Sequence, residues 1–212
     1  MIIVGHRRNT VAELGETPSH LGVEIDVRSS RGRLVLNHDP FQGGEDFEGW
    51  LERYSHRLLV LNVKEDGLED RVRALLGPRG IEDYFFLDQP FPTLLRTARA
   101  GDPRCALRYS EYESLETVLA LEGVVRWVWV DCFTRCPLDG AGAAALRAAG
   151  FRICLVSPEL QGRTDPAEAL ALQGQLRLEG IVPDAVCTKV PASWASWRAS
   201  SWASCTGQGE DA

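Results

Sequence analysis

The sequence predicts an α/β protein in which eight strands alternate with helices to form a single (β/α)8 TIM barrel. Short apolar runs of strand length alternate with segments whose apolar residues recur at helical spacing. Most of the runs are almost continuously apolar, which is typical of parallel strands buried on both faces. Polar or charged residues follow the ends of these runs, and the carboxyl ends of barrel strands are where such folds build their sites.

The eight predicted strands are short, and the helices between them differ in length. The strands cover residues 2–5, 23–27, 58–63, 84–87, 105–109, 127–130, 152–156 and 185–188. Helical spacing covers residues 47–54, 68–76, 93–100, 115–121, 140–149 and 167–178. The segment between the first two strands has room only for a stunted helix. After the second strand we expect a hairpin reaching Asn37, with little or no further insertion.

The length of 212 residues suits one domain with a sizeable core. We expect the barrel domain to occupy residues 1–191. Residues 192–212 repeat Trp, Ala and Ser without a helical or strand period, so we expect a low-complexity tail that is ordered partly at most.

The charge argues against one broad class of partner. Thirty acidic residues against twenty-three basic ones give a formal charge of −7, which disfavours nucleic-acid binding through clustered Lys and Arg. No apolar run is long enough to span a membrane, and no signal-peptide pattern opens the chain, so we expect a cytoplasmic protein. The six cysteines are scattered, mostly within apolar runs, which favours buried reduced thiols.

Two carboxylates in the second strand are the first candidate site residues. Glu24 and Asp26 alternate with Val23, Ile25 and Val27, so they lie on one face about 7 Å apart along the strand. Two buried like charges need a proton or a cation between them, and a divalent cation is the simplest choice. The alternative is an exposed edge strand on which both acids are solvated.

Two histidines follow strands near these acids. His6 follows the first strand, and the hairpin after the second strand returns the chain to His38. Either histidine alone is more simply explained as a hydrogen-bonded residue of the core. As a pair tied to the two carboxylates, they favour a pocket that combines a metal, an acid and a base.

The order of these motifs resembles a known family. An H-R pair at His6, an E-x-D strand at Glu24 and a short hairpin ending in H-D at His38 are similar to the glycerophosphodiester phosphodiesterases, whose relatives include the phosphatidylinositol phospholipase C-like barrels. Later segments fit a short, bacterial-type branch of this family, namely L-N-V-K, Y-F-F-L-D, S-E-Y-E, V-S-P-E-L and C-T-K-V-P. The resemblance covers the chain from Met1 to about Pro191.

The resemblance implies a metal-dependent phosphodiesterase acting on small glycerophosphodiester-like substrates, through a cyclic phosphate. It implies Mg²⁺ or Ca²⁺ held by Glu24, Asp26 and Asn62, phosphate binding by Arg7 and Lys64, and general acid and base catalysis by His6 and His38. The sequence leaves open which histidine is the acid. Arg7 and Lys64 also have plain alternatives, as an ion-pair partner and as a strand cap.

Two positions depart from the family pattern. Asn62 stands where the family commonly has a carboxylate, and an amide oxygen would have to serve as the third ligand. Lys189 gives T-K-V-P where the last strand usually ends T-D-x-P. These departures and the missing insertion support a rival hypothesis, a catalytically idle barrel that binds a phosphorylated ligand or a protein partner.

Overall fold

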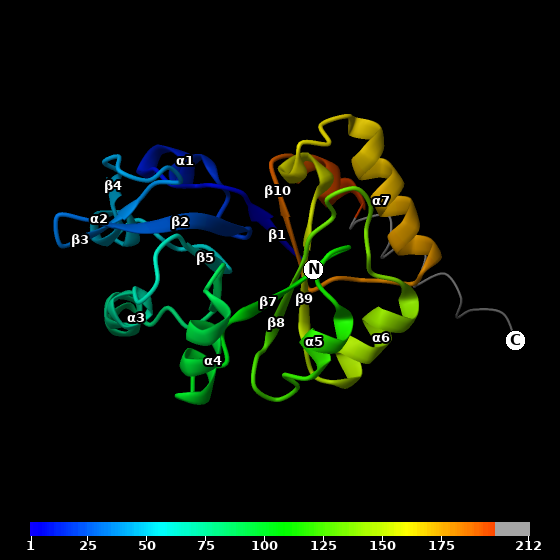
Figure 1. The fold of residues 1–212 in the computed structure, drawn as a ribbon. Helices are drawn as coiled ribbons and strands as arrows, with labels where there is room; N and C mark the ends of the chain where they lie inside the picture. Colours follow the sequence, from blue (N-terminus) through cyan, green and yellow to red (C-terminus); the bar gives the residue numbers. More distant parts are fainter. Residues whose placement is uncertain (198–212) are drawn as a thin grey trace, which may run out of the picture.

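The computed structural model describes residues 1–197, in which strands and helices alternate around a curled sheet (Figure 1). The strands are β1 Ile2–Gly5, β2 Gly22–Ser30, β3 Arg33–Leu36, β4 Glu45–Asp46, β5 Leu59–Val63, β6 Tyr84–Leu87, β7 Ala106–Tyr109, β8 Trp127–Val130, β9 Arg152–Val156 and β10 Ala185–Thr188. The helices are α1 Val11–Glu16, α2 Phe47–Leu51, α3 Glu69–Leu76, α4 Phe91–Arg99, α5 Leu115–Leu119, α6 Gly140–Ala148 and α7 Pro166–Leu178, with short 3-10 turns at Gly77–Arg79 and Pro158–Gln161. The predicted elements are therefore present.

Eight of the strands follow one another in parallel around the sheet. Seven neighbouring pairs form parallel ladders: β10–β1, β1–β2, β2–β5, β5–β6, β7–β8, β8–β9 and β9–β10. Between β6 and β7 there is only a single parallel bridge, from Phe86 to Cys105. The α/β class and the strand order are confirmed, whereas the continuous ladder of a closed barrel is interrupted at this one seam.

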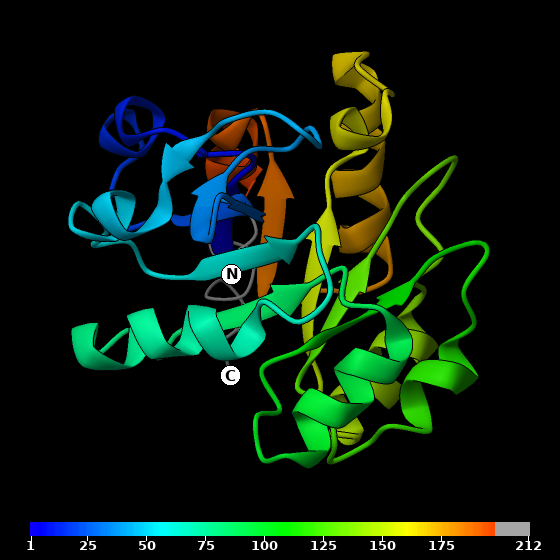
Figure 2. The same ribbon diagram turned by 60° about the vertical axis from the view of Figure 1, so that its left-hand side comes forward.

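The connection between β2 and β5 is compact. The far end of β2 pairs antiparallel with β3, which pairs in turn with β4, and α2 completes the segment. This hairpin lies at the edge of the molecule, away from α5, α6 and α7 (Figures 1 and 2). The small size of this connection is as expected.

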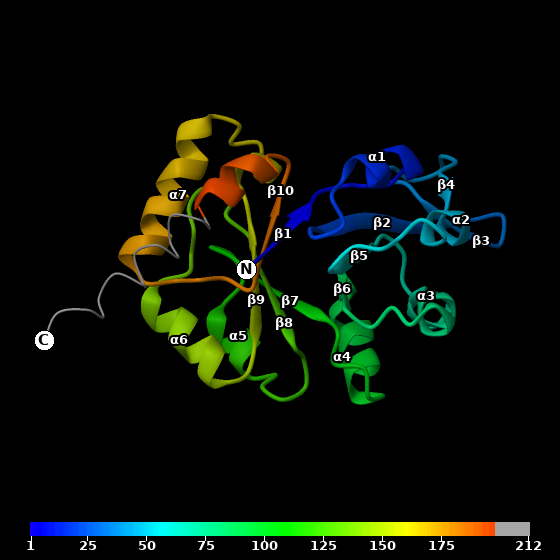
Figure 3. The same cartoon turned by 180° about the vertical axis from the view of Figure 1, so that it is seen from behind.

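Strand alternation separates an inner core from an outer one. Phe85 and Trp127 stack with ring centroids 4.5 Å apart inside the curled sheet, so this contact joins β6 to β8 across the seam. The outer core is divided. One cluster packs α1, α2 and α3 against β2, β5 and β6, and the other packs α4 to α7 against β7 to β10. Figure 3 shows from behind that α1, α2 and α3 lie on the opposite side of the molecule from α5, α6 and α7.

The same alternation decides which residues face the open end of the curled sheet at the carboxyl ends of its parallel strands, here called the mouth. Ile2 and Val4 belong to the inner core, so His6 continues their face beyond the end of β1. Val60 is also inside, which places Asn62 and then Lys64 on the inner face of β5. The polar residues after the strands therefore converge at one end.

Residues 191–197 are helical and pack on the core, although the tail was expected to begin at residue 192. Trp194 and Trp197 are buried, and their indole N–H groups donate to the Ser157 hydroxyl at 2.9 Å and the Gln173 carbonyl at 3.1 Å. Their spacing of three places both rings on one helix face, a signal hidden by the repetitive composition. The rest of the expected tail lies outside the described residues.

The cysteines of the described residues are buried and reduced, as the sequence predicts. The five cysteines of residues 1–197 are buried free thiols, and burial raises the pKa of Cys105 to about 12. Cys205 lies beyond them. No helix in the described part of the chain is long and apolar enough to cross a lipid bilayer.

Trp194 gives a test of this packing. Trp194→Ala removes a fully buried indole and leaves the Ser157 hydroxyl without its donor, so the free energy of unfolding should fall by about 3 to 5 kcal/mol. Urea denaturation would measure this loss. Phe41→Ala, at a fully exposed ring, is the control and should change stability by less than about 0.5 kcal/mol. A Trp194→Ala protein as stable as this control would contradict the packing.

Candidate active site

The site is built on the inner face of β2. Val23, Ile25 and Val27 pack in an outer cluster, so Glu24 and Asp26 face inward, where they are 1% and 0% exposed. Because β2 is paired with β1 on one side and β5 on the other, it is no edge strand. The alternative of solvated acids is therefore excluded.

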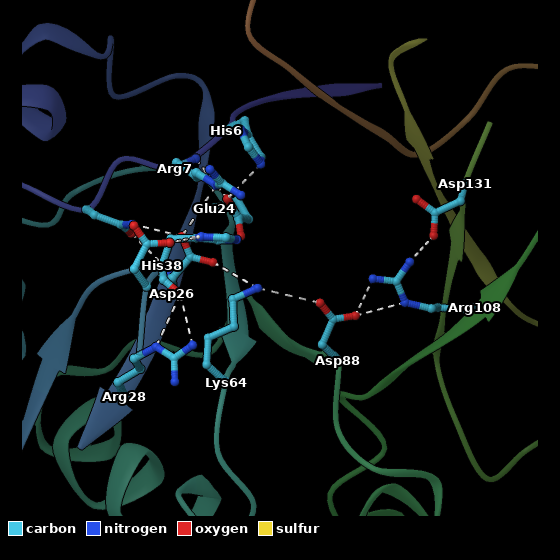
Figure 4. A network of polar contacts seen from close by, with 12 residues as sticks. His6, Arg7, Glu24, Asp26, Arg28, His38, Lys64, Asp88, Arg108 and Asp131 are labelled. Atoms are coloured by element: carbon cyan, nitrogen blue, oxygen red, sulfur yellow. Dashed lines mark hydrogen bonds and ion pairs between the residues drawn. The ribbon is translucent and has the colours of Figure 1, made fainter. Parts of the chain in front are cut away.

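Asp26 is the centre of the site. The Asn9 amide donates to Asp26 Oδ2 at 2.8 Å, and the Asp26 backbone N–H donates to Asn9 Oδ1 at the same distance. Lys64 Nζ lies 3.1 Å from Asp26 Oδ1, and Arg7 Nε lies 3.7 Å from Oδ2 (Figure 4). Groups from two separate segments, the loop after β1 and the end of β5, thus converge on one carboxylate.

Glu24 has an unusual environment for an acid. The Arg7 backbone N–H donates to Glu24 Oε2 at 2.8 Å, and His6 Nε2 lies 3.8 Å from the same oxygen. Burial, followed by repulsion from Asp26, raises the pKa of Glu24 to about 8 despite opposing contributions from its neighbours. Arg7 has a φ of 52°, which is a left-handed backbone conformation that residues other than glycine rarely adopt. It is found at the residue whose N–H bonds to Glu24.

His6 is held neutral by its surroundings. Burial, and then the charges of Arg7 and Lys189, lower the pKa of His6 to about 3. Lys189 comes near because Thr188 is the register partner of Gly5, and the His6 backbone N–H donates to the Thr188 carbonyl at 3.1 Å. His6 Nδ1 is buried without a hydrogen-bond partner, so this nitrogen is available to a ligand group.

His38 stands just past β3, next to Asn37, whose backbone N–H donates to the Asp26 carbonyl at 3.0 Å. Its Nδ1 lies 2.9 Å from Asp39 Oδ1, and this hydrogen bond is the main cause of a lowered pKa at Asp39. Because a charged carboxylate can only accept, His38 donates through Nδ1 and keeps Nε2 for other partners. Arg28 fixes the backbone here, donating to the His38 carbonyl through Nη2 at 2.9 Å.

The loop that carries His38 is tied to β2 and β3. The Asn37 backbone N–H donates to the Asp26 carbonyl at 3.0 Å, and the Asn37 side chain bonds to the Gly43 carbonyl and to the Asp39 N–H. A Cβ at Gly44 would lie 2.4 Å from the Leu36 carbonyl oxygen, so only glycine allows the chain to return this closely.

The oxygens of β2 and β5 fit a hard cation. Asp26 and Asn62 are register partners, and the Oδ1 atom of each is buried without a hydrogen bond, although Lys64 is close to that of Asp26. No three His, Cys, Asp or Glu side chains gather in a metal-binding arrangement within residues 1–197. A cation here would therefore take Glu24, Asp26 and the amide oxygen of Asn62, all of which are ligands that Mg²⁺ and Ca²⁺ accept.

A second polar cluster lies across the mouth. Arg108 bonds to both Asp88 and Asp131, and Lys64 Nζ lies 3.9 Å from Asp88 Oδ2, which links this cluster to the first (Figure 4). Asp88 and Asp131 thus form salt bridges with Arg108. Two cavities lie near these residues: one of about 870 Å³ is lined by Arg28 and the hairpin, and one of about 630 Å³ is lined by Asp88 and Arg108.

Sequence reasoning missed three residues of this site. Arg28 could have been found, because it continues the alternation of Glu24 and Asp26 on one face. Asp39 stands beside His38 in the H-D motif, where its orienting role could have been inferred. Asn9 gave no signal, because only the fold brings its loop onto Asp26.

Comparison with known proteins gives a likeness of structure but not of sequence. No family model matches the chain, and no curated protein matches it either. Its structure is similar to that of an Agrobacterium tumefaciens protein assigned as a glycerophosphoryl diester phosphodiesterase, with a TM-score of 0.68 and 15% identity over 95% of this chain and 99% of the other. A glycerophosphodiester phosphodiesterase of the same organism has a TM-score of 0.62 and 16% identity over 94% and 99% of the two chains.

A third similar structure comes from another organism. A glycerophosphoryl diester phosphodiesterase of Parabacteroides distasonis has a TM-score of 0.63 and 14% identity over 94% of this chain and 86% of the other. At such low identity the likeness establishes a shared fold. That fold agrees with the resemblance carried by the H-R, E-x-D and H-D motifs.

The raised pKa of Glu24 predicts how stability depends on pH. The folded protein holds this proton up to about pH 8, whereas an ordinary glutamate releases it near 4.5. Between these values the folded state binds more protons than the unfolded chain, so this group makes the free energy of unfolding fall as pH rises. Glu24→Gln should remove this contribution in buffer containing a chelator.

Urea titrations of both proteins between about pH 5 and 8 would measure the difference. His6 makes the free energy of unfolding rise with pH, because below pH 6.5 the unfolded chain binds a proton that folded His6 does not. This contribution is the same in wild type and Glu24→Gln. Glu16→Gln, at an exposed position, is the control. Parallel stability curves for wild type and Glu24→Gln would show that Glu24 is not protonated as described.

Proposed function

We propose that the protein is a metal-dependent phosphodiesterase that hydrolyses glycerophosphodiester-like substrates. The observation that carries this proposal is the buried Glu24–Asp26 pair, which faces the mouth of the sheet beside His6 and is surrounded by Arg7 and Lys64. A site with two acids and several cations suits a hard cation together with an anionic substrate. The shared fold of proteins assigned as glycerophosphodiester phosphodiesterases supports this substrate class.

The cations of the site would bind the phosphate. Lys64 and Arg7 are each near Asp26 yet partly exposed, so their remaining donors can reach an anion in the mouth. Lys189, beside His6, adds a third positive charge that the family pattern lacks. A Mg²⁺ or Ca²⁺ ion held by Glu24, Asp26 and Asn62 would supply further neutralisation of charge on the phosphate oxygens.

The two histidines would divide the proton transfers. His6 stands beside Glu24 and has a buried ring nitrogen without a hydrogen-bond partner, so it would accept the proton of the attacking hydroxyl. His38, whose Nδ1 is held by Asp39, would donate from Nε2 to the leaving alcohol. A hydroxyl of the substrate next to the phosphodiester would attack first, giving a cyclic phosphate that water then opens, so no protein nucleophile is needed.

The ligand set predicts modest affinity for divalent ions. Asn62→Glu adds an anionic ligand in register with Asp26 and should tighten cation binding, whereas Glu24→Gln should weaken it by about tenfold or more. Calorimetric titration with Mg²⁺ and Ca²⁺ would measure both changes, and Glu16→Gln should leave binding unaltered. If neither substitution changes affinity, the cation does not bind between these residues.

The division of roles predicts different responses to the leaving group. His6→Ala and His38→Ala should each lower turnover of glycerophosphodiesters by roughly two to four orders of magnitude. With a p-nitrophenyl leaving group, which needs no protonation, His38→Ala should recover most of its loss while His6→Ala should not. Steady-state kinetics with and without EDTA would measure these effects, and His20→Ala, at an exposed histidine, is the control.

Three outcomes would contradict parts of this proposal. A larger rescue of His6→Ala than of His38→Ala would reverse the two roles. Equal rates for diesters with and without the adjacent hydroxyl, at matched leaving group, would exclude the cyclic route. Phosphate binding without turnover of any diester, at any divalent ion, would favour the idle barrel instead.

A further inference from the structure

Two cysteines that the proposed phosphodiesterase chemistry does not use lie side by side in the loop after β8. Cys132 and Cys136 are four residues apart, and their thiols are hydrogen-bonded to each other. Cys132 has no exposed surface, whereas Cys136 is 9% exposed. Two thiols in contact need to approach only slightly further to reach the S–S distance of about 2 Å in a disulfide.

The loop between the two cysteines is curved around a single carboxylate. Glu111 accepts from the backbone N–H groups of three consecutive residues, namely Phe133 at 3.3 Å, Thr134 at 2.7 Å and Arg135 at 2.8 Å. Desolvation acts to raise the pKa of Glu111, but the hydrogen bonds from Thr134 and Arg135 outweigh it and lower the pKa to about 2. Successive N–H groups that point at one anion require a bent segment, and this bend brings the two ends of the segment together.

The backbone beside each cysteine is anchored as well. Arg163 donates to the Cys132 carbonyl through Nη1 at 3.2 Å, and the Tyr109 hydroxyl donates to the Pro137 carbonyl at 2.8 Å. Pro137 directly follows Cys136 and has a backbone dihedral fixed by its ring. These contacts hold the two thiols against each other without a bond between the sulfurs.

The contact makes the two thiols chemically different. The hydrogen bond with Cys132 lowers the pKa of Cys136, although burial opposes this change. The same hydrogen bond raises the pKa of Cys132 well above that of an ordinary thiol, and burial raises it further. Because the thiolate is the reactive form of cysteine, Cys136 is the nucleophile of the pair and Cys132 keeps its proton for a second step.

The other three described cysteines differ from this pair. Cys105, Cys154 and Cys187 have no exposed surface, and burial raises the pKa of each thiol above its ordinary value. The Cys105 thiol is directed to the Asp102 carbonyl at 3.6 Å. Within residues 1–197, the loop after β8 is therefore the place where oxidation of cysteine is most favoured.

We propose that Cys132 and Cys136 form a reversible oxidation site, which hydrogen peroxide converts into an intramolecular disulfide. The Cys136 thiolate attacks one oxygen of the peroxide, the O–O bond breaks, and a sulfenic acid forms while the other oxygen leaves as water. The Cys132 sulfur then attacks the sulfenic acid, forming the S–S bond and releasing a second water with the Cys132 proton. Two thiols and one peroxide thus give one disulfide and two waters, and a thiol reductant reverses the change.

Peptide mapping of the full-length protein tests this site, and the test does not depend on the proposed phosphodiesterase function. Trypsin cleaves after Arg135, so the two cysteines fall in separate peptides, residues 127–135 and 136–147, with one cysteine each. After treatment with limiting hydrogen peroxide in a buffer containing a chelator, and alkylation of the remaining thiols, these peptides should be joined by a disulfide. Dithiothreitol should release both as free thiols.

The remaining cysteines are internal controls in the same digest. The peptides of Cys105, Cys154 and Cys187 should be oxidised at least about tenfold less, because their thiols are less ionised. The proposal is overturned if peptides 127–135 and 136–147 stay separate while other cysteines are oxidised. It is also overturned if either peptide is joined mainly to another cysteine, Cys205 included.

Substitution of each cysteine tests the order of the two steps. In Cys132→Ser the sulfenic acid of Cys136 has no thiol to meet, so dimedone should label peptide 136–147 after peroxide treatment. In Cys136→Ser, dimedone should label peptide 127–135 at least about tenfold less, because Cys132 is buried and protonated. Urea denaturation of the reduced proteins would show that both variants fold. Equal labelling in the two variants would overturn the assignment of Cys136 as the nucleophile.

Glu111 is the positioning residue of the pair, and its substitution leaves both thiols in place. Glu111→Gln keeps the size of the side chain but removes the charged acceptor of the loop, so the joined peptides should form about tenfold more slowly or less. Alkylation at intervals after the addition of peroxide would measure this rate. Glu16→Gln, at an exposed position, is the control and should oxidise as wild type does. A wild-type rate for Glu111→Gln would overturn the role given to Glu111.

Discussion

The burial of Asp26 is the constraint on which the arrangement of the site depends. A charged carboxylate with no exposed surface must be compensated by nearby donors and cations, and here these come from separate parts of the chain. Asn9 reaches it from the loop after β1, Lys64 from the end of β5, and the Asn37 N–H ties the hairpin to its backbone carbonyl. The same contacts fix the loop of His6 and the hairpin that carries His38, the two histidines on which the proposed chemistry depends.

Glu24 adds a second buried acid beside the first, and burial together with repulsion between the two acids makes it costly to ionise both. The raised pKa of Glu24 and the buried oxygens of Asp26 and Asn62 that lack hydrogen bonds both reflect this cost. A divalent cation would remove it. An amide at Asn62 keeps the number of buried acids at two, and a third anionic group here would need still more compensation.

At the interruption of the sheet between β6 and β7, side chains again hold separate parts of the chain together. Two outer clusters form on either side of it, and the inner stack of Phe85 on Trp127 holds the halves together. Where backbone pairing ends, the Asp88–Arg108 ion pair bridges the strand ends and leaves the cavity beside it. Side-chain contacts thus take the place of backbone hydrogen bonds between β6 and β7. Side chains at a cavity are the groups that can recognise a ligand.

The sequence by itself determined the alternation of elements and the residues on the inner face of β2, because strand periodicity and apolar runs are local properties. The motifs around His6, Glu24 and His38 also indicated one site. Only the tertiary structure showed that Asn9 binds Asp26, that Lys189 approaches His6, and that Trp194 belongs to the core. The tertiary structure also located the interruption of the sheet between β6 and β7. These features depend on strand register and on contacts between distant segments, which no local pattern encodes.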